Sequence, residues 1–300
     1  MSKLRNIIKN LLLGLVLVIG VQGFAQVDKL NRAMTLLQAR NPEAARPAID
    51  SVIRHPDTKS DPMSWTTRAY IYYEIYKRSE KSLLNSPLRD TVISSIKNSN
   101  SLKPDAEIKT NNNKLLYNLS ASYYNFSIKL LQDSINDARS LLAFNRSKEL
   151  AKIVKPDTSF NAADIEYFNT VGAQYSDIFN KDNLNLKSQD VAKLALLKVL
   201  EIQPENARAN FNLGIMYYNQ AANLGKFLDY GADISQIDVI QESIIKLAKQ
   251  SVQLIEKVYK KEPKNVKAME ALYLIYRMLS DPVKTEKFKK ECIDNGIKVD

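Results

Sequence analysis

Apolar and small residues recur along this chain at spacings of three and four positions rather than at every second position. Residues spaced in that way lie on one face of an α-helix, whereas a half-buried strand alternates apolar and polar side chains. The recurring sets are Ala44/Ala48/Ser51, Val92/Ile96/Ser99, Phe144/Lys148/Ala151, Ala192/Leu196/Val199 and Ser251/Ile255/Val258. Lys148 is the one residue in these sets that is neither apolar nor small. The pattern predicts a chain of amphipathic helices.

A three-residue segment with proline in the middle, called a proline phrase below, follows each of these sets. The phrases are His55-Pro56-Asp57, Lys103-Pro104-Asp105, Lys155-Pro156-Asp157, Gln203-Pro204-Glu205 and Glu262-Pro263-Lys264, with prolines 48, 52, 48 and 59 residues apart. Proline cannot continue a helix interior, because it lacks the N–H and crowds the preceding turn. The acid that usually follows it can cap the next helix. Each phrase therefore predicts the end of one helix and the start of another.

A second recurring helix follows each phrase, with a large residue, an aliphatic one, a small one and a tyrosine at helical spacing. The copies begin at Trp65, Leu116, Phe168, Asn210 and Met269, and they end at Tyr72-Tyr73, Tyr123-Tyr124, Tyr175, Tyr217-Tyr218 and Tyr276. The small site, which is Gly172 or Gly214 in two copies, predicts that a partner helix comes close there.

These residues resemble the tetratricopeptide repeat (TPR) family, whose helix-turn-helix unit carries W-x2-LG-x2-Y and closes with a proline. Residues 206–218 match that pattern best, and the resemblance runs from about Val27 to Asn295. The repeats are longer than the family's minimal unit of about 34 residues. Tyr273 also occupies a site where the family prefers a small residue. The resemblance implies a solenoid whose concave groove binds a protein or peptide segment.

The expected fold class is all-α, an α-solenoid of about five to six TPR-like helix-turn-helix units with lengthened helices. Predicted helices span 27–40, 43–55, 62–81, 89–101, 112–134, 138–154, 161–180, 188–202, 206–224, 236–261, 265–280 and 282–295. The last helix would cap the solenoid, with Phe288 and Cys292 inward and Lys287, Lys289 and Lys290 outward. We expect one domain over residues 26–300.

The first 25 residues have the pattern of a bacterial signal peptide. Lys3, Arg5 and Lys9 precede an apolar run over 11–24, and small residues surround Ala25, after which cleavage is expected. The run is shorter than the roughly 20 apolar residues of a spanning helix, so an uncleaved anchor is the weaker alternative. The prediction is an exported protein in the periplasm, at the outer-membrane periphery or outside the cell, with no membrane span after cleavage.

The chain is basic, with 43 Lys and Arg against 33 Asp and Glu and a net charge of +10. Removal of residues 1–25 leaves 40 cations and a net charge of +7, most of it between positions 246 and 300. A solvated capping surface explains this excess, and an anionic partner such as a membrane surface or an acidic protein segment is the alternative. Nucleic acid is not expected as a partner, because the chain is exported.

The sequence contains no complete catalytic or metal-binding motif. A single cysteine, Cys292, and a single histidine, His55, exclude a disulfide framework and every metal motif that needs two such ligands. The phosphate-loop, dinucleotide and nucleophile-elbow signatures are missing as well. We therefore predict no enzyme, no metal and no cofactor. Two carboxylates that converge from distant helices stay open as an alternative.

The tyrosines fall into two sets. Those in the repeat register, predicted to lie in the core, are Tyr72, Tyr123, Tyr175, Tyr217 and Tyr276. The residue that follows is rotated by about 100° around the helix, toward the groove. The predicted groove residues are Tyr73, Tyr117, Asn118, Tyr124, Phe211, Asn212 and Tyr218. Asparagine amides there would bond the backbone of a bound segment, and the aromatic rings would cover its apolar side chains. The alternative is that the lengthened helices bury these tyrosines.

The leading functional hypothesis is a non-enzymatic, exported scaffold that binds a peptide or protein segment in its groove, within a cell-envelope assembly. One alternative is a carboxylate-dependent hydrolase or glycan-active protein. The other is a structural spacer that binds an anionic partner through its basic C-terminal end.

Overall fold

The structure is a computed structural model that describes residues 26–81, 83–134, 137–182, 185–226 and 233–299. All regular secondary structure in these ranges is helical, which confirms the all-α prediction. The predicted signal peptide, residues 1–25, lies outside the described residues. Of the helices described, none has the length and hydropathy to cross a membrane. The chain forms two compact units, divided between Thr158 and Ser159, and the single domain over 26–300 stays a prediction.

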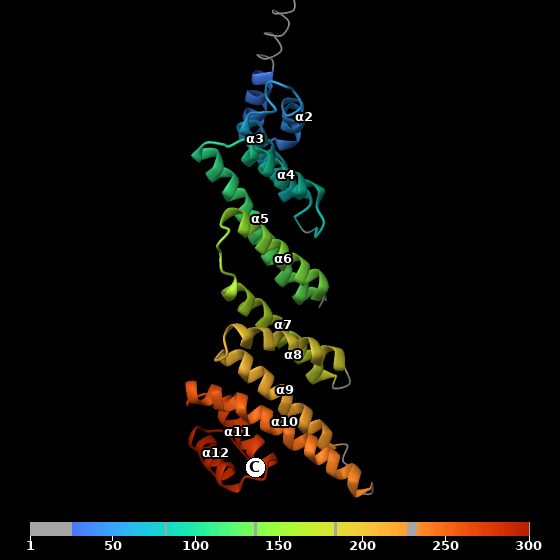
Figure 1. Cartoon of the computed structure of the whole chain (residues 1–300), viewed down its shortest axis with the longest axis vertical. Helices are drawn as coiled ribbons and strands as arrows, with labels where there is room; N and C mark the ends of the chain where they lie inside the picture. The colour runs from blue at the N-terminus through green and yellow to red at the C-terminus, as the bar shows by residue number, and fades with distance from the viewer. Residues whose placement is uncertain (1–25, 82, 135–136, 183–184, 227–232, 300) are drawn as a thin grey trace, which may run out of the picture. The chain divides into compact units, whose positions relative to one another are not determined.

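In the first unit, a helical segment over 26–38 and five labelled helices follow one another (Figure 1). The helices are α2 (Pro42–Val52), α3 (Pro62–Ser79), α4 (Pro87–Ser101), α5 (Ala106–Ser134) and α6 (Asp137–Val154). The pairs α3/α4 and α5/α6 form helical hairpins, α2 packs on α3, and α5 packs on both helices of the preceding hairpin. Hairpins thus stack in chain order, as the repeats predict.

The described residues of the second unit form three hairpins (Figure 1). Their helices are α7 (Asn161–Lys181), α8 (Leu186–Ile202), α9 (Ala207–Lys226), α10 (Ile234–Lys261), α11 (Val266–Met278) and α12 (Pro282–Asp294). Each hairpin packs on the next, through α7 and α8 against α9 and through α9 and α10 against α11. The first helices of neighbouring hairpins therefore lie side by side.

Short polar side chains begin most of these helices. Four helices start with proline after a residue whose side chain accepts a backbone N–H of the first turn, namely Asn41, Asp61, Ser86 and Asp281. Asp105 caps α5 as predicted, since it accepts from the α5 backbone at 2.8 Å. In the other proline phrases the residue after the proline does not cap the next helix. Asp61 rather than Asp57 caps α3, and Phe160, which precedes α7, makes no side-chain cap. Asn206 and Asn265, one residue further along the chain, cap α9 and α11, where each side-chain oxygen accepts from the third backbone N–H of its helix.

The predicted apolar faces are buried in α4, α8 and α10, where Ile96, Leu196 and Ile255 are each 0% exposed. In α2 the predicted register was wrong, because Ile49 and Val52 are buried and the face of Ala44, Ala48 and Ser51 is not. The larger aliphatic side chains bury more apolar surface and so take the inner face. The register tyrosines are confirmed in the core, at 3–9% exposure for Tyr72, Tyr123, Tyr175, Tyr217 and Tyr276.

Glycine permits close helix approach in the second unit. A Cβ atom at Gly172 would lie 2.5 Å from Leu196 Cδ2, and one at Gly214 would lie 2.6 Å from Ile255 Cδ1. The prediction of close contact at the small site is thereby confirmed. In the last hairpin Tyr273 fills this position, is 3% exposed and still allows α11 to pack on α12.

Helix α12 covers the end of the second unit as predicted. Phe288 and Cys292 are 4% and 0% exposed. The Phe288 ring stacks on Tyr276, with centroids 5.7 Å apart, and meets Tyr259 edge-on at 5.2 Å. Aromatic stacking and burial together fix the position of this helix.

Candidate binding cleft

A cleft of about 650 Å³ opens between α3 and α5 in the first unit. These are the first helices of two successive hairpins. Two predicted groove residues, Tyr73 of α3 and Asn118 of α5, both line it. The packing of one hairpin on the next thus brings together two side chains that the repeat register assigned to a groove.

The α3 wall of the cleft is aromatic and basic. Tyr73 lies beside Tyr76, with ring centroids 6.2 Å apart, and Lys77 Nζ is 5.0 Å from the Tyr73 ring centroid. Burial raises the pKa of the Tyr73 hydroxyl, and the charges of Tyr76 and Glu74 add to this rise, whereas a hydrogen bond with Asn118 opposes it. Tyr73 is therefore a neutral hydroxyl at neutral pH that both donates and accepts hydrogen bonds.

The α5 wall carries polar groups beside an aromatic ring. Asn118, Ser122 and Phe126 follow one another at spacings of four, so they share one face of the helix, and all three line the cleft. Phe126 also packs against the apolar core of the first unit. Amide and hydroxyl groups on this wall can bond a polypeptide backbone, while the ring offers apolar contact.

The charges at the cleft are positive. Among the described residues, no aspartate or glutamate lines it, whereas Lys77, Arg78, Lys81 and Lys129 do. Two of these cations have carboxylate partners beyond the cleft, since Lys77 lies 2.7 Å from Glu74 and Arg78 lies 3.0 Å from a second glutamate, Glu43. Lys81 and Lys129 also line the cleft, and its four cations together favour anionic groups.

Behind Tyr76 lies a buried guanidinium. Arg89 is 1% exposed, and its Nη2 donates to the Tyr76 hydroxyl at 2.9 Å and to a loop carbonyl at 2.9 Å. The guanidinium also lies 4.1 Å from the ring centroid of Tyr123. The Tyr76 hydroxyl is in turn 3.0 Å from Ser122 Oγ, which lines the cleft. A chain of polar contacts therefore runs from the buried charge to the cleft surface.

Arg89 keeps its positive charge in this position. Burial lowers the pKa of Arg89, but hydrogen bonds with Tyr123 and Tyr76 outweigh that effect and leave the pKa raised. Within the described part of the chain its hydrogen-bond acceptors are neutral oxygens, and its Nε is buried without a hydrogen-bond partner. A buried charge without a counter-charge is costly. The sequence pattern did not reveal a role for this residue, which was predicted only as the first residue of a helix over 89–101.

A second hollow of about 580 Å³ lies on the other side of α3. Tyr70 and Glu74 line it, and it shares Lys77 and Arg78 with the cleft. Helix α3 thus presents one polar surface with a hollow on either side.

The other two predicted groove residues of α5 do not line the cleft. Tyr117 is 68% exposed. Tyr124 lies against Phe144 of α6, with ring centroids 6.1 Å apart, and so packs within its own hairpin. Helix α5 therefore turns Asn118, but neither tyrosine, toward α3.

The remaining predicted groove residues belong to α9 in the second unit. Phe211 and Tyr218 are partly buried against the apolar cluster of α10, α11 and α12, and Asn212 is half-buried. Burial raises the pKa of Tyr218, and the nearby charge of Arg277 opposes that rise. These contacts agree with the alternative stated above, in which the lengthened helices bury some of the predicted groove aromatics.

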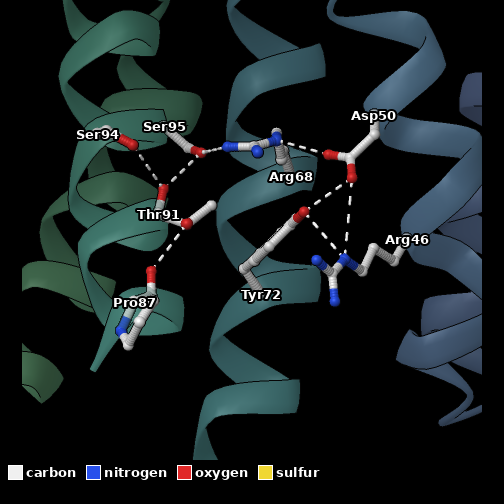
Figure 2. Close-up of polar contacts among 8 residues, drawn as sticks. All are labelled: Arg46, Asp50, Arg68, Tyr72, Pro87, Thr91, Ser94 and Ser95. Atoms are coloured by element: carbon white, nitrogen blue, oxygen red, sulfur yellow. Dashed lines mark hydrogen bonds and ion pairs between the residues drawn. The ribbon is translucent and has the colours of Figure 1, made fainter.

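A separate polar network joins α2, α3 and α4 (Figure 2). Asp50 accepts hydrogen bonds from Arg68 Nε at 2.8 Å and from the Tyr72 hydroxyl at 2.7 Å. Arg68 also donates to Ser95 of α4 at 2.8 Å. Burial raises the pKa of Tyr72, and its hydrogen bond to Asp50 raises it further. The network ties three helices together and stands apart from the cleft lining.

Two lysines of the basic C-terminal end make contacts within the second unit. Lys284 Nζ donates to the Tyr276 hydroxyl at 2.9 Å, and Lys287 lies 3.8 Å from Glu291 and over the Phe288 ring. Two of the cations that would face an anionic partner thus help to hold α12 in place.

Comparison with known proteins shows a distant likeness to a solved structure. No protein-family model matches the chain, and no curated protein matches it. Among solved structures it is similar to "Crystal structure of PilW, widely conserved type IV pilus biogenesis factor", with a TM-score of 0.36 and 14% sequence identity. The match covers 90% of this chain and 93% of that chain. Membership of the TPR family stays a prediction. In the described residues, no group of His, Cys, Asp and Glu could hold a metal ion.

Proposed function

We propose that this protein is a non-enzymatic, exported scaffold of the bacterial cell envelope that binds a segment of a partner protein in the cleft between α3 and α5. The observation that carries the proposal is the meeting of Tyr73 and Asn118 in a cleft of about 650 Å³. That volume lies within the range of ligand sites. Amides and tyrosine hydroxyls there suit a polypeptide backbone, and Tyr73 and Phe126 offer apolar contact.

The envelope part of the proposal rests on the signal-peptide pattern of residues 1–25. The scaffold part is supported by hairpin packing, which leaves the first helix of one hairpin beside the first helix of the next. A carboxylate-dependent hydrolase has less support, because the residues that line the cleft include no Asp or Glu in the described part of the chain.

Photo-cross-linking in the native cell envelope tests the proposal. A photoreactive residue in place of Ser79, at the cleft, should trap a protein partner, whereas the same residue in place of Lys97, exposed on α4, should not. Tyr73→Ala combined with Asn118→Ala should weaken capture of that same partner by about tenfold. Equal trapping from both positions, or capture that the double variant leaves unchanged, contradicts the proposal. Circular dichroism of each variant checks that the fold is intact.

A further inference from the structure

We propose that the cleft recognises an acidic segment of its partner, and that a side-chain carboxylate of this segment accepts a hydrogen bond from Ser122 at the end of the chain Arg89–Tyr76–Ser122. The inference deepens the proposed function and rests on it. It assigns a role to a buried guanidinium and two hydroxyls that no repeat pattern requires.

The direction of the hydrogen bonds follows from the first donor. A guanidinium only donates, so the Tyr76 oxygen accepts from Arg89 Nη2 at 2.9 Å. In the 3.0 Å contact between Tyr76 and Ser122 Oγ the geometry permits either hydroxyl to donate. We assign the donated proton to Tyr76, because a phenol that accepts from a cation becomes a better donor. Ser122 then has its own proton to donate, and the described residues provide no further hydrogen-bond partner for it. The chain ends as an O–H donor at the cleft surface.

The charge of Arg89 makes that donor selective for anions. Arg89 is 1% exposed, and its neutral acceptors leave its positive charge uncompensated within the described residues. A carboxylate beside Ser122 would meet this charge through two hydroxyls, in a setting that water screens poorly. A neutral amide at the same place would gain only an ordinary hydrogen bond.

The basic residues that line the cleft also favour an anionic ligand. Lys81 and Lys129 line the cleft together with Lys77 and Arg78, and the lining includes no acid in the described ranges. Positive charge around an O–H donor favours an acidic ligand and speeds its approach. The length of the wall, with Asn118 before Ser122 and Phe126 after it, suits an extended chain rather than a lone small anion.

Fluorescence anisotropy with a labelled oligoglutamate peptide, blocked at both ends, tests the inference. The blocked ends remove terminal charges, so only side-chain carboxylates can bind. The full chain should bind this peptide at least about tenfold more tightly than a blocked oligoglutamine peptide, and the difference should shrink as salt is added. Equal affinity for the two peptides overturns the inference.

Variants separate the hydrogen-bond chain from general attraction. Ser122→Ala and Tyr76→Phe should each weaken oligoglutamate binding by about tenfold, and the double variant should be hardly weaker than either, because the groups act as one unit. Ser94→Ala, which removes a hydroxyl on α4 that bonds only its own helix, should bind as the parent does. If Ser122→Ala binds oligoglutamate normally, the proposed chain is wrong. Should Tyr76→Phe fold poorly, Ser122→Ala still decides.

Charge-reversal variants and competing anions test whether the attraction is specific to the cleft and to an acidic peptide. Lys81→Glu with Lys129→Glu should weaken binding by about tenfold or more, while Lys97→Glu, on the exposed side of α4, should have little effect. Equal losses in both would mean unspecific attraction and overturn the inference. So would tighter binding of inorganic phosphate, or of phosphatidylglycerol vesicles, with the same dependence on Ser122.

The scaffold proposal and the inference of an acidic segment can fail independently of each other. If envelope cross-links from the cleft depend on Tyr73 and Asn118 while oligoglutamate binding ignores Ser122, the scaffold proposal stands and the acidic segment falls. If the cleft yields no protein cross-link although oligoglutamate binds as expected, the scaffold proposal falls.

Discussion

The two units pack helical hairpins in different ways. In the first unit a buried cluster of polar side chains joins α3, α4 and α5, where Thr66, Ser99 and Asn112 are 0–3% exposed and hydrogen-bond one another at 2.9 Å. In the second unit the closest contacts at the two helix glycines are made by aliphatic side chains, Leu196 at Gly172 and an isoleucine at Gly214, beside a hydrogen bond from Ser251 to the Gly214 carbonyl at 2.7 Å.

The polar cluster of the first unit helps to explain why the cleft lies in that unit. Hydrogen bonds are directional, so a satisfied polar cluster specifies the rotation of each helix, whereas aliphatic contacts tolerate small shifts. The cleft lies between α3 and α5, the helices that this cluster connects. Tyr73 and Asn118 are thereby held on helices whose faces are fixed, as a binding site requires.

Loss of the polar cluster should have the largest effect. Asn112→Leu removes hydrogen bonds to Ser99 and Asn100 at 2.9 and 2.8 Å and leaves Thr66 without its amide partner. We expect a loss of about 2–3 kcal/mol in the free energy of unfolding, measured with urea. Asn98→Leu, at an exposed position on α4, is the matched control and should change stability little.

A triple variant sharpens this test. With Thr66→Val and Ser99→Ala added to Asn112→Leu, the two buried hydroxyls that the single variant strands are gone, and much of the lost stability should return. If the single variant is as stable as the parent, the polar cluster is not what holds the first unit together.

Close packing in the second unit can be broken by one methyl group. Gly172→Ala would place a Cβ 2.5 Å from Leu196 Cδ2, and overpacking of this kind costs about 1–3 kcal/mol. Since alanine favours helices over glycine by about 1 kcal/mol, the net loss should be about 1–2 kcal/mol in urea unfolding.

Gly225→Ala is the matched control for this loss. Among the described residues, the nearest neighbouring atom, Ile244 Cδ1, would lie 3.9 Å from the new methyl, so stability should be unchanged or slightly raised. Leu196→Ala added to Gly172→Ala should cost less than the two single losses together. Equal stability of the Gly172 and Gly225 variants would show that the second unit does not depend on close approach.

Much of this fold is predictable because its signals are local. Each proline phrase interrupts a helix through a missing N–H, and each apolar face shows itself at spacings of three and four, so the helices α7 to α12 begin and end within a few residues of the prediction. Helix α5 begins at Ala106 rather than 112. Its first turns are polar and carry little apolar periodicity, although Asp105 caps them.

The cleft was predictable only in part. The resemblance to TPR repeats, together with the rotation of about 100° per residue around a helix, placed Tyr73 and Asn118 toward a groove. Which neighbouring residue joins them depends on helix rotation, and that is set by contacts such as Tyr124 with Phe144 across a hairpin. Arg89 is beyond sequence reasoning, because only the folded chain brings it behind Tyr76.

The smallest expected effect concerns a hydrogen bond between α10 and α12 that the second unit adds to its apolar packing. Tyr259 donates to Glu291 at 2.7 Å, and this bond, assisted by burial, raises the pKa of Tyr259 to about 12. Because the folded pKa lies above the unfolded value of about 10, the contribution is fully present below pH 10 and is lost as the pH rises toward 12. Tyr259→Phe should therefore lower stability by less than about 1 kcal/mol at pH 8, and the gap to the parent should close by pH 12. Urea unfolding across that range measures it, with Tyr117→Phe, at a 68% exposed site, as the control. A gap that stays constant with pH would mean that the hydroxyl contributes through packing, in keeping with the rest of its unit.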